Sequence, residues 1–298
     1  MPLITQYVLF LSANYISTNA SCKPHHFNQY QPRLWWCPTG PLSFLPIHAA
    51  GIYGNEKTPL GSCVSDYVVS SYTPTITTLL NKLKEASTTD QSSTSLLLIS
   101  QPSTPGQNPI PAVKIETATL RNLVEPLMKS LLLENDSATV IQVKEKMKTY
   151  SWVHFACHAI QDIAQPLKSG AQLHDGRLEV LEIMKQRLPN ADLAFLSACQ
   201  TSTGDKKLSD EAVHLAAGML GAGYRSVVAT MWSIKDQYGP LVAEDFYTYI
   251  LKENLKDGQM NSANAAYALH YAVQNIRKRL GNTEEALLTW VPYVHFGI

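Results

Sequence analysis

The sequence has no surplus of charge of either sign. Lysine plus arginine number 24 and aspartate plus glutamate number 24 among 298 residues, so the formal net charge is zero. Proteins that bind DNA or RNA non-specifically depend on an excess of positive charge. We therefore expect no nucleic-acid partner. Hydrophobic residues make up 45% of the chain and charged residues only 16%, which is typical of a globular protein with a core to bury.

Long hydrophobic runs are also missing. No stretch approaches the roughly 18 apolar residues that a membrane-spanning helix needs. The short apolar segment Tyr7–Leu11, with Thr18–Ala20 as a conceivable cleavage site, has no Lys or Arg before it, whereas a signal peptide begins with positive charge. We expect neither a membrane anchor nor a signal peptide.

Cysteine is scarce. Five cysteines, an odd number, are too few for a disulfide scaffold in a chain of 298 residues, which favours reduced thiols and a cytoplasmic location. One alternative remains open. A secreted hydrolase would need its leader cleaved and Asn19 or Asn135, which both lie in Asn-X-Ser sequences, glycosylated.

Common catalytic signatures are absent too. The chain has no GxSxG motif, no Walker loop, and no GxGxxG motif after a strand.

Alternating strand and helix patterns dominate the chain after residue 32. We interpret residues 1–32 as an irregular leader and 33–298 as one domain. Apolar runs predict strands at 34–37, 66–72, 95–100, 152–157, 192–197 and 224–231. Apolar residues at helical spacing predict helices at 75–86, 118–133, 178–188, 209–220, 236–251 and 262–280. This order indicates an α/β domain, with a mainly parallel sheet covered by helices on both faces.

Two consecutive strands end in side chains that can do chemistry. One ends at Cys157 and His158, and the next ends at Cys199, 41 residues after His158. A single crossover would bring both strand ends to the same edge of the sheet, where sites form in parallel sheets. A thiol beside an imidazole is a nucleophilic dyad, and the N–H groups of Cys199 and Ala159, in turns after the strands, could bind the oxyanion.

Two other interpretations of these residues stay open. Free cysteine is among the most buried residue types, and a histidine at a strand end is often only a hydrogen-bonded polar group. A zinc site would use His154, Cys157, His158 and His174, although the chain offers no CxxC pair. By strand alternation Cys157 points away from His158, so we place it in the core.

Several ordered motifs resemble the CHAT domain, a family related to caspases and separase and often found behind tetratricopeptide repeats. The motifs are Val153–His158 (VHFACH), Phe195–Thr201 (FLSACQT), Asp210–Leu215 (DEAVHL) and Val228–Ser233 (VATMWS). Leu34–Gly51 and Trp290–Tyr293 also look like the start and end of the family's fungal members. The resemblance covers roughly residues 33–298.

The resemblance implies a caspase-like α/β sandwich of three layers and a cysteine endopeptidase, with Cys199 as the nucleophile and His158 as the catalytic histidine. In the related proteases a glycine usually follows that histidine, and here it is Ala159. An alanine would be strained if the turn required a positive φ. Asp236 would line the pocket for a basic substrate residue, or else cap a helix N-terminus.

The expected partners are a protein or peptide substrate and, by the resemblance, a regulatory repeat module or partner protein. No metal or organic cofactor is implied. The alternative function is a catalytically weak or inactive CHAT module that acts as a regulatory protein-interaction domain.

Overall fold

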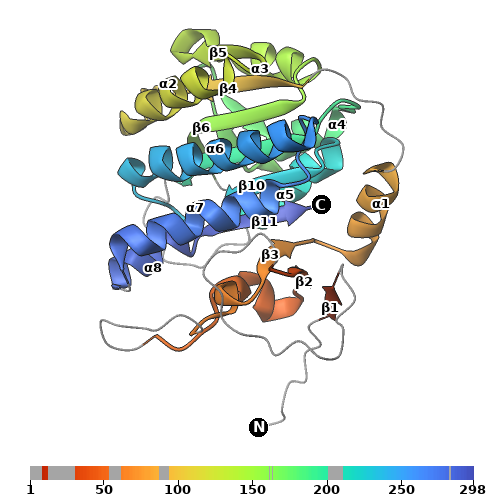
Figure 1. Cartoon of the computed structure of the whole chain (residues 1–298). Coiled ribbons are helices and arrows are strands. Elements are labelled where there is room, and N and C mark those ends of the chain that lie inside the picture. The colour runs from red at the N-terminus through yellow and green to blue at the C-terminus, as the bar shows by residue number, and fades with distance from the viewer. Residues whose placement is uncertain are drawn as a thin grey trace.

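Strands and helices alternate along most of the chain (Figure 1). The computed structural model describes residues 9–12, 31–53, 62–86, 94–160, 162, 164–200, 211–281 and 283–298. The strands are β1 (Leu9–Ser12), β2 (Arg33–Cys37), β3 (Val69–Tyr72), β4 (Ser95–Ser100), β5 (Lys129–Glu134), β6 (Trp152–Ile160), β7 (Gly170–Gln172), β8 (Arg177–Glu179), β9 (Leu193–Gln200), β10 (Ser226–Thr230) and β11 (Tyr293–Gly297). The helices are α1 (Ile76–Ala86), α2 (Ala112–Val124), α3 (Val140–Met147), α4 (Val180–Lys185), α5 (Glu211–Ala222), α6 (Gly239–Asp257), α7 (Ala265–Leu280) and α8 (Glu284–Trp290).

These strands form one sheet in the order β1-β2-β3-β11-β10-β9-β6-β4-β5. The strands from β10 to β5 in this order run parallel to one another, and β11 pairs antiparallel to β10. A hairpin of β7 and β8 attaches to the end of β6. The expected α/β domain with a mainly parallel sheet is confirmed.

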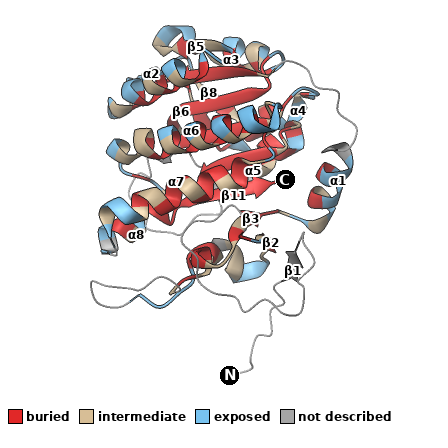
Figure 2. Ribbon diagram, in the orientation of Figure 1, coloured by how far each residue is buried: buried red, intermediate tan, exposed pale blue. Residues whose placement is uncertain are grey.

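Helices cover both faces of the sheet. Helices α2, α6 and α7 pack on one face, and α3, α4 and α5 pack on the other, each over its own apolar core (Figure 1). Figure 2 shows the central strands almost wholly buried, whereas helices such as α2 and α6 mix buried residues with intermediate and exposed ones. Strand β4 is buried at every position, as expected of a strand covered on both faces. Among the described residues no helix has the length and apolarity needed to cross a membrane.

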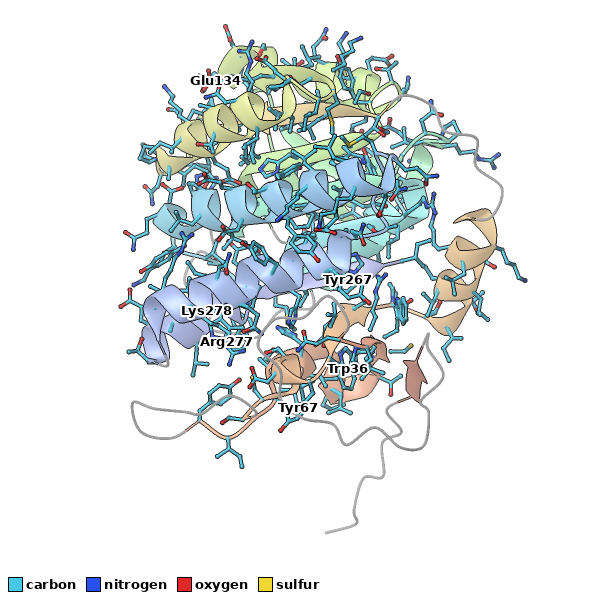
Figure 3. All side chains as sticks on the ribbon, viewed as in Figure 1. Trp36, Tyr67, Glu134, Tyr267, Arg277 and Lys278 are labelled. Atoms are coloured by element: carbon cyan, nitrogen blue, oxygen red, sulfur yellow. The ribbon has the colours of Figure 1, made fainter. Side chains whose placement is uncertain are left out.

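Strands β2 and β3 extend the sheet beyond β11. Side chains of α7 hydrogen-bond to Ser65 and Asp66 in the segment that connects these two strands. The guanidinium of Arg277 on α7 donates to Asp66 at 2.9 Å and lies over the ring of Trp290, 4.8 Å from its centroid. Figure 3 labels Arg277 on this helix above the segment that carries Tyr67. Strand β1, which pairs antiparallel with β2, lies within residues 1–32, where the sequence shows no strand period.

One predicted helix is partly wrong. The helix expected at 118–133 ends at Val124, and residues 129–134 form the edge strand β5. Glu125 still has helical φ and ψ, but Pro126 has no N–H to continue the helical hydrogen bonds, and the following leucines pair with the buried strand β4. Helices α3 and α8 and strand β11 are not predicted, because their apolar residues are too few or too close together to show a period.

His48, between β2 and β3, hydrogen-bonds to residues near the C-terminal end of the chain and on β3. Its Nε2 donates to the Val291 carbonyl at 2.9 Å, and its Nδ1 lies 2.8 Å from the Tyr72 hydroxyl. Both ring nitrogens are used by a neutral ring, and burial lowers the pKa of His48 from 6.5 to about 4. Burial likewise lowers the pKa of His270 to about 4.

We therefore predict that the protein loses stability as the pH falls from 6.5 towards 4. In that window the unfolded chain takes up protons on these histidines and the folded chain does not, so unfolding is favoured. His48 alone contributes a loss of about 2.5 kcal/mol at about pH 4.5. Urea unfolding from about pH 7 to about pH 4.5 measures the loss. The His48→Gln variant, although less stable at neutral pH, should show a flatter pH dependence; an unchanged slope would contradict the assignment.

Candidate functional site

The two strands that carry the predicted dyad are direct neighbours. Strands β6 and β9 run parallel, and their register pairs the Cα of His158 with that of Cys199. Neighbouring strands lie about 4.8 Å apart, so the two backbones are as close as two strands can bring them. The structure thus brings His158 and Cys199 together at one edge of the sheet, as the crossover predicts. The side chain of Cys199 lies outside the described part of the chain.

The imidazole of His158 is held from one side only. It is 2% exposed, and its Nε2 lies 2.7 Å from the carbonyl oxygen of Asn108. A carbonyl oxygen can only accept, so Nε2 carries a proton. Within the described residues Nδ1 has no hydrogen-bond partner. In the neutral ring the lone pair is therefore on Nδ1, which is the condition for a base that faces a thiol.

The carbonyl of Asn108 belongs to a loop that lies over the end of β6. The loop begins where the backbone N–H of Gln101 donates to the carbonyl of Ala156 at 2.9 Å. Further along, Ile110 and Val113 pack against Ala156. The bond from Asn108 to His158 spans 50 residues of sequence, and the sequence analysis does not find it because no pattern marks a backbone acceptor.

The two predicted oxyanion donors are not in turns. Cys199 and Ala159 both lie inside strands, because the β7 hairpin continues the pairing of β6 beyond β4. Ala159 pairs with Ala171 on one side and with Gln200 on the other. Its N–H therefore faces a neighbouring strand. Ala159 also has no positive φ that would strain an alanine. Among the described residues, Asn135 is the one residue other than glycine with a positive φ.

Asp236 caps a helix, though not the one that it precedes. Its Oδ2 accepts the backbone N–H of Ala112, the first residue of α2, at 3.0 Å. The helix expected to begin at Asp236 starts instead with a 3-10 turn, Asp236–Tyr238, and continues as α6. A cleft of about 520 Å³ opens nearby between residues 232–235 and α8, and Asp236 is not among the described residues that line it.

The zinc site considered from the sequence does not form. His154 lies on the face of β6 that packs against α2, whereas Cys157 lies fully buried in the core on the other face. The described residues contain no group of three or more His, Cys, Asp or Glu side chains that could hold a metal ion. The core position predicted for Cys157 is confirmed.

Glu116, a buried hydrogen-bond partner of His154, is not among the residues expected from the sequence. Its Oε1 lies 2.8 Å from Nε2 of His154, with side-chain exposures of 3% and 0%. The sequence signal for Glu116 is a carboxylate on the apolar side of a helix. That signal is visible only if the helix begins at Ala112, and the predicted helix begins at residue 118.

Comparison with known proteins gives a family and a fold. A family model described as the CHAT domain matches residues 17–298. Two crystal structures of the Saccharomyces cerevisiae separase–securin complex match with TM-scores of 0.51 and 0.52, each at 14% identity, over 79% of this chain and 14% of that chain. Gingipain R (RGPB) of Porphyromonas gingivalis, an Arg-specific cysteine proteinase, matches with a TM-score of 0.49 at 12% identity, over 76% of this chain and 53% of that chain.

This chain therefore spans about half of the gingipain chain and about one seventh of the separase chain. A comparison with the sequences of curated proteins found no match. The likeness to separase bears on the fold alone, and it confirms the expected caspase-like α/β sandwich.

The contact from Asp236 to Ala112 yields a stability prediction. Asp236→Ala removes the acceptor for the first N–H of α2 and should lower the free energy of unfolding by about 1 kcal/mol. Asp236→Asn keeps an amide oxygen at the same place and should lose less than half of that. Chemical unfolding at neutral pH compares the two variants. Equal losses would show that the carboxylate acts here through its charge and not as a cap.

Proposed function

Because the chain belongs to the CHAT domain family, we propose that it is a cysteine endopeptidase with Cys199 as nucleophile and His158 as acid and base. The observation that carries the proposal is the register of β6 and β9, which sets the two residues opposite each other. Paired positions of neighbouring strands lie about 4.8 Å apart, so the proposed nucleophile and base start from adjacent backbone positions.

The proposed reaction uses each nitrogen of His158 differently. Nδ1 accepts the proton of the Cys199 thiol, and Nε2 stays bonded to the carbonyl of Asn108. The thiolate attacks the substrate carbonyl carbon, and the resulting tetrahedral intermediate collapses when Nδ1 returns the proton to the leaving amine. Water then hydrolyses the thioester, with His158 acting again as the base.

The proposed oxyanion donors are the N–H groups of Cys199 and Ala159. Since the N–H of Ala159 faces a neighbouring strand, it becomes free for a substrate oxyanion only when that pairing loosens. We infer low basal activity until an activating event reorders this edge of the sheet.

A protein or peptide is the proposed substrate, and Asp236 is the proposed acid for a basic residue before the cleaved bond. One of its oxygens caps α2 and the other has no hydrogen bond among the described residues. A fungal-type origin, a cytoplasmic location and control by a repeat module or other partner protein belong to the same proposal.

A second candidate function is a weak or inactive module that regulates a partner by binding it. The observation in its favour is Ala159, which stands where related proteases have glycine and whose N–H lies within a strand ladder.

Covalent labelling tests the dyad. A peptide electrophile with an arginine beside its reactive group should modify the native protein once, as intact mass shows, and should not modify Cys199→Ala. His158→Ala should react at least about 100-fold more slowly, because the base is gone. Cys37→Ala, which removes a half-buried thiol elsewhere, serves as the control and should react normally. Equal labelling of all variants, or labelling only after denaturation, would sink the peptidase proposal and favour the binding module.

A variant that removes the negative charge of Asp236 tests its proposed role in the substrate pocket. Asp236→Asn retains a cap for α2 but removes the negative charge, so it should react at least about tenfold more slowly with the arginine electrophile. Its rate with a matched norleucine electrophile should stay near that of the wild type. A parallel fall with both electrophiles would mean that Asp236 supports the fold and does not select the substrate.

A further inference from the structure

Glu116 is a buried carboxylate that the proposed reaction does not use. It lies on the inner side of α2 and is 2% exposed. A carboxylate without water or partners is strongly disfavoured, so the bonds that it makes determine how α2 can sit on the sheet.

The first bond joins Glu116 to strand β6. Its Oε1 lies 2.8 Å from Nε2 of His154, and the Tyr247 hydroxyl lies 3.4 Å from Nδ1 of the same ring. The ring also stacks on Phe195 of β9 at a centroid distance of 4.9 Å. With Nε2 bonded to the carboxylate and Nδ1 to the Tyr247 hydroxyl, both ring nitrogens of His154 have partners and the ring is held in place.

The second oxygen of Glu116 faces the start of α6. A Cβ built on Gly239, the first residue of that helix, would lie 3.0 Å from Oε2 of Glu116 and 3.3 Å from the hydroxyl oxygen of Ser197 on β9. Only a residue without a side chain fits there without displacing its neighbours. Glu116 on α2 thus lies against both His154 of β6 and the start of α6.

The same helix and its leading loop also hold the proposed catalytic histidine. His154 and His158 lie four residues apart on one face of β6. Glu116 bonds the first, and Asn108, eight residues before Glu116, bonds the second. A third contact, from Asp236 to Ala112, fixes the helix start between them.

We propose that Glu116 is a positioning residue that anchors α2 to His154 and thereby keeps the Asn108 carbonyl on Nε2 of His158. This inference rests on the proposed function, in which Nδ1 of His158 must face Cys199. Without the anchor, the loop keeps the contacts of Gln101 with Ala156 and of Asn108 with His158, but α2 loses the bond that joins the helix itself to β6. The ring of His158 is then no longer confined to one tautomer. Hydrogen-bond partners that orient metal-binding imidazoles commonly change activity by about 10–100-fold, and we expect a change of the same size here.

The experiment reads the ring directly as well as its reactivity. Nitrogen-15 NMR of histidine-labelled protein, with His158→Ala for assignment, should show His158 of the wild type protonated at Nε2. Glu116→Ala should give a mixture of tautomers and label Cys199 about 10–100-fold more slowly. Glu116→Gln keeps an oxygen acceptor for His154 and should restore the wild-type tautomer and a rate within about threefold of the wild type. Glu116→Leu fills the space without an acceptor, and replaces Glu116→Ala if that variant does not fold.

Leu120→Ala is the matched control, because it opens a cavity under the same helix, one turn further along, at a fully buried residue that bonds neither histidine. It should lower the thermal midpoint but leave the tautomer and the labelling rate unchanged. The positioning role would be overturned if the His158 tautomer and the labelling rate stayed the same in Glu116→Ala and Glu116→Leu, or if Leu120→Ala changed both equally. A tautomer that depends on Glu116 in a protein whose Cys199 is never labelled would support the positioning role and refute the peptidase.

Discussion

The parallel pairing of β6 with β9 is the interaction on which the rest of this structure depends. The ladder runs in register from Trp152 opposite Leu193 to Ala159 opposite Gln200, and His158 and Cys199 are one rung of it. A slip of one residue would move every side chain of a strand to the opposite face. Val153, Phe155 and Cys157 fill one core while Trp152 fills the other, so burial on both faces fixes the register. The relative position of the two residues is therefore set by the interior of the protein and not by surface loops.

A sheet can bring two backbones together, but it cannot orient a ring. The orientation of His158 comes from the loop before α2, whose Asn108 carbonyl accepts from Nε2 and leaves Nδ1 without a partner among the described residues. Backbone acceptors serve well here because they have no side-chain rotamers to lose, provided that the loop itself is held. The buried bond between Glu116 and His154 lies one helical turn inside the same helix, in a region of low dielectric constant where hydrogen bonds are strong. Fold stability and ring orientation thus depend on one set of contacts.

Those elements that bury continuous apolar runs could be predicted from the sequence, and those defined by long-range contacts could not. Strand β4 follows from its run of leucines, and the strands that end at His158 and Cys199 follow from theirs. Leu131 of β5 continues the helical spacing of Leu123 and Leu127, and only the pairing with β4 makes this segment a strand. Asn108 and Glu116 reach β6 across 50 and 38 residues of sequence, so their roles emerge only from packing.

The position of Ala159 connects this geometry to regulation. In β6 it has paired neighbours on both sides, and an N–H that faces a paired strand is not open to an oxyanion. On one side the partner is β7, a strand of three residues, and short strands at the end of a sheet are among the elements that open at least cost. On the other side the partner is the end of β9 itself, immediately after Cys199. Under the proposed function, the oxyanion site is therefore closed whichever neighbour the N–H faces, and activation would require movement of the backbone beside His158 and Cys199.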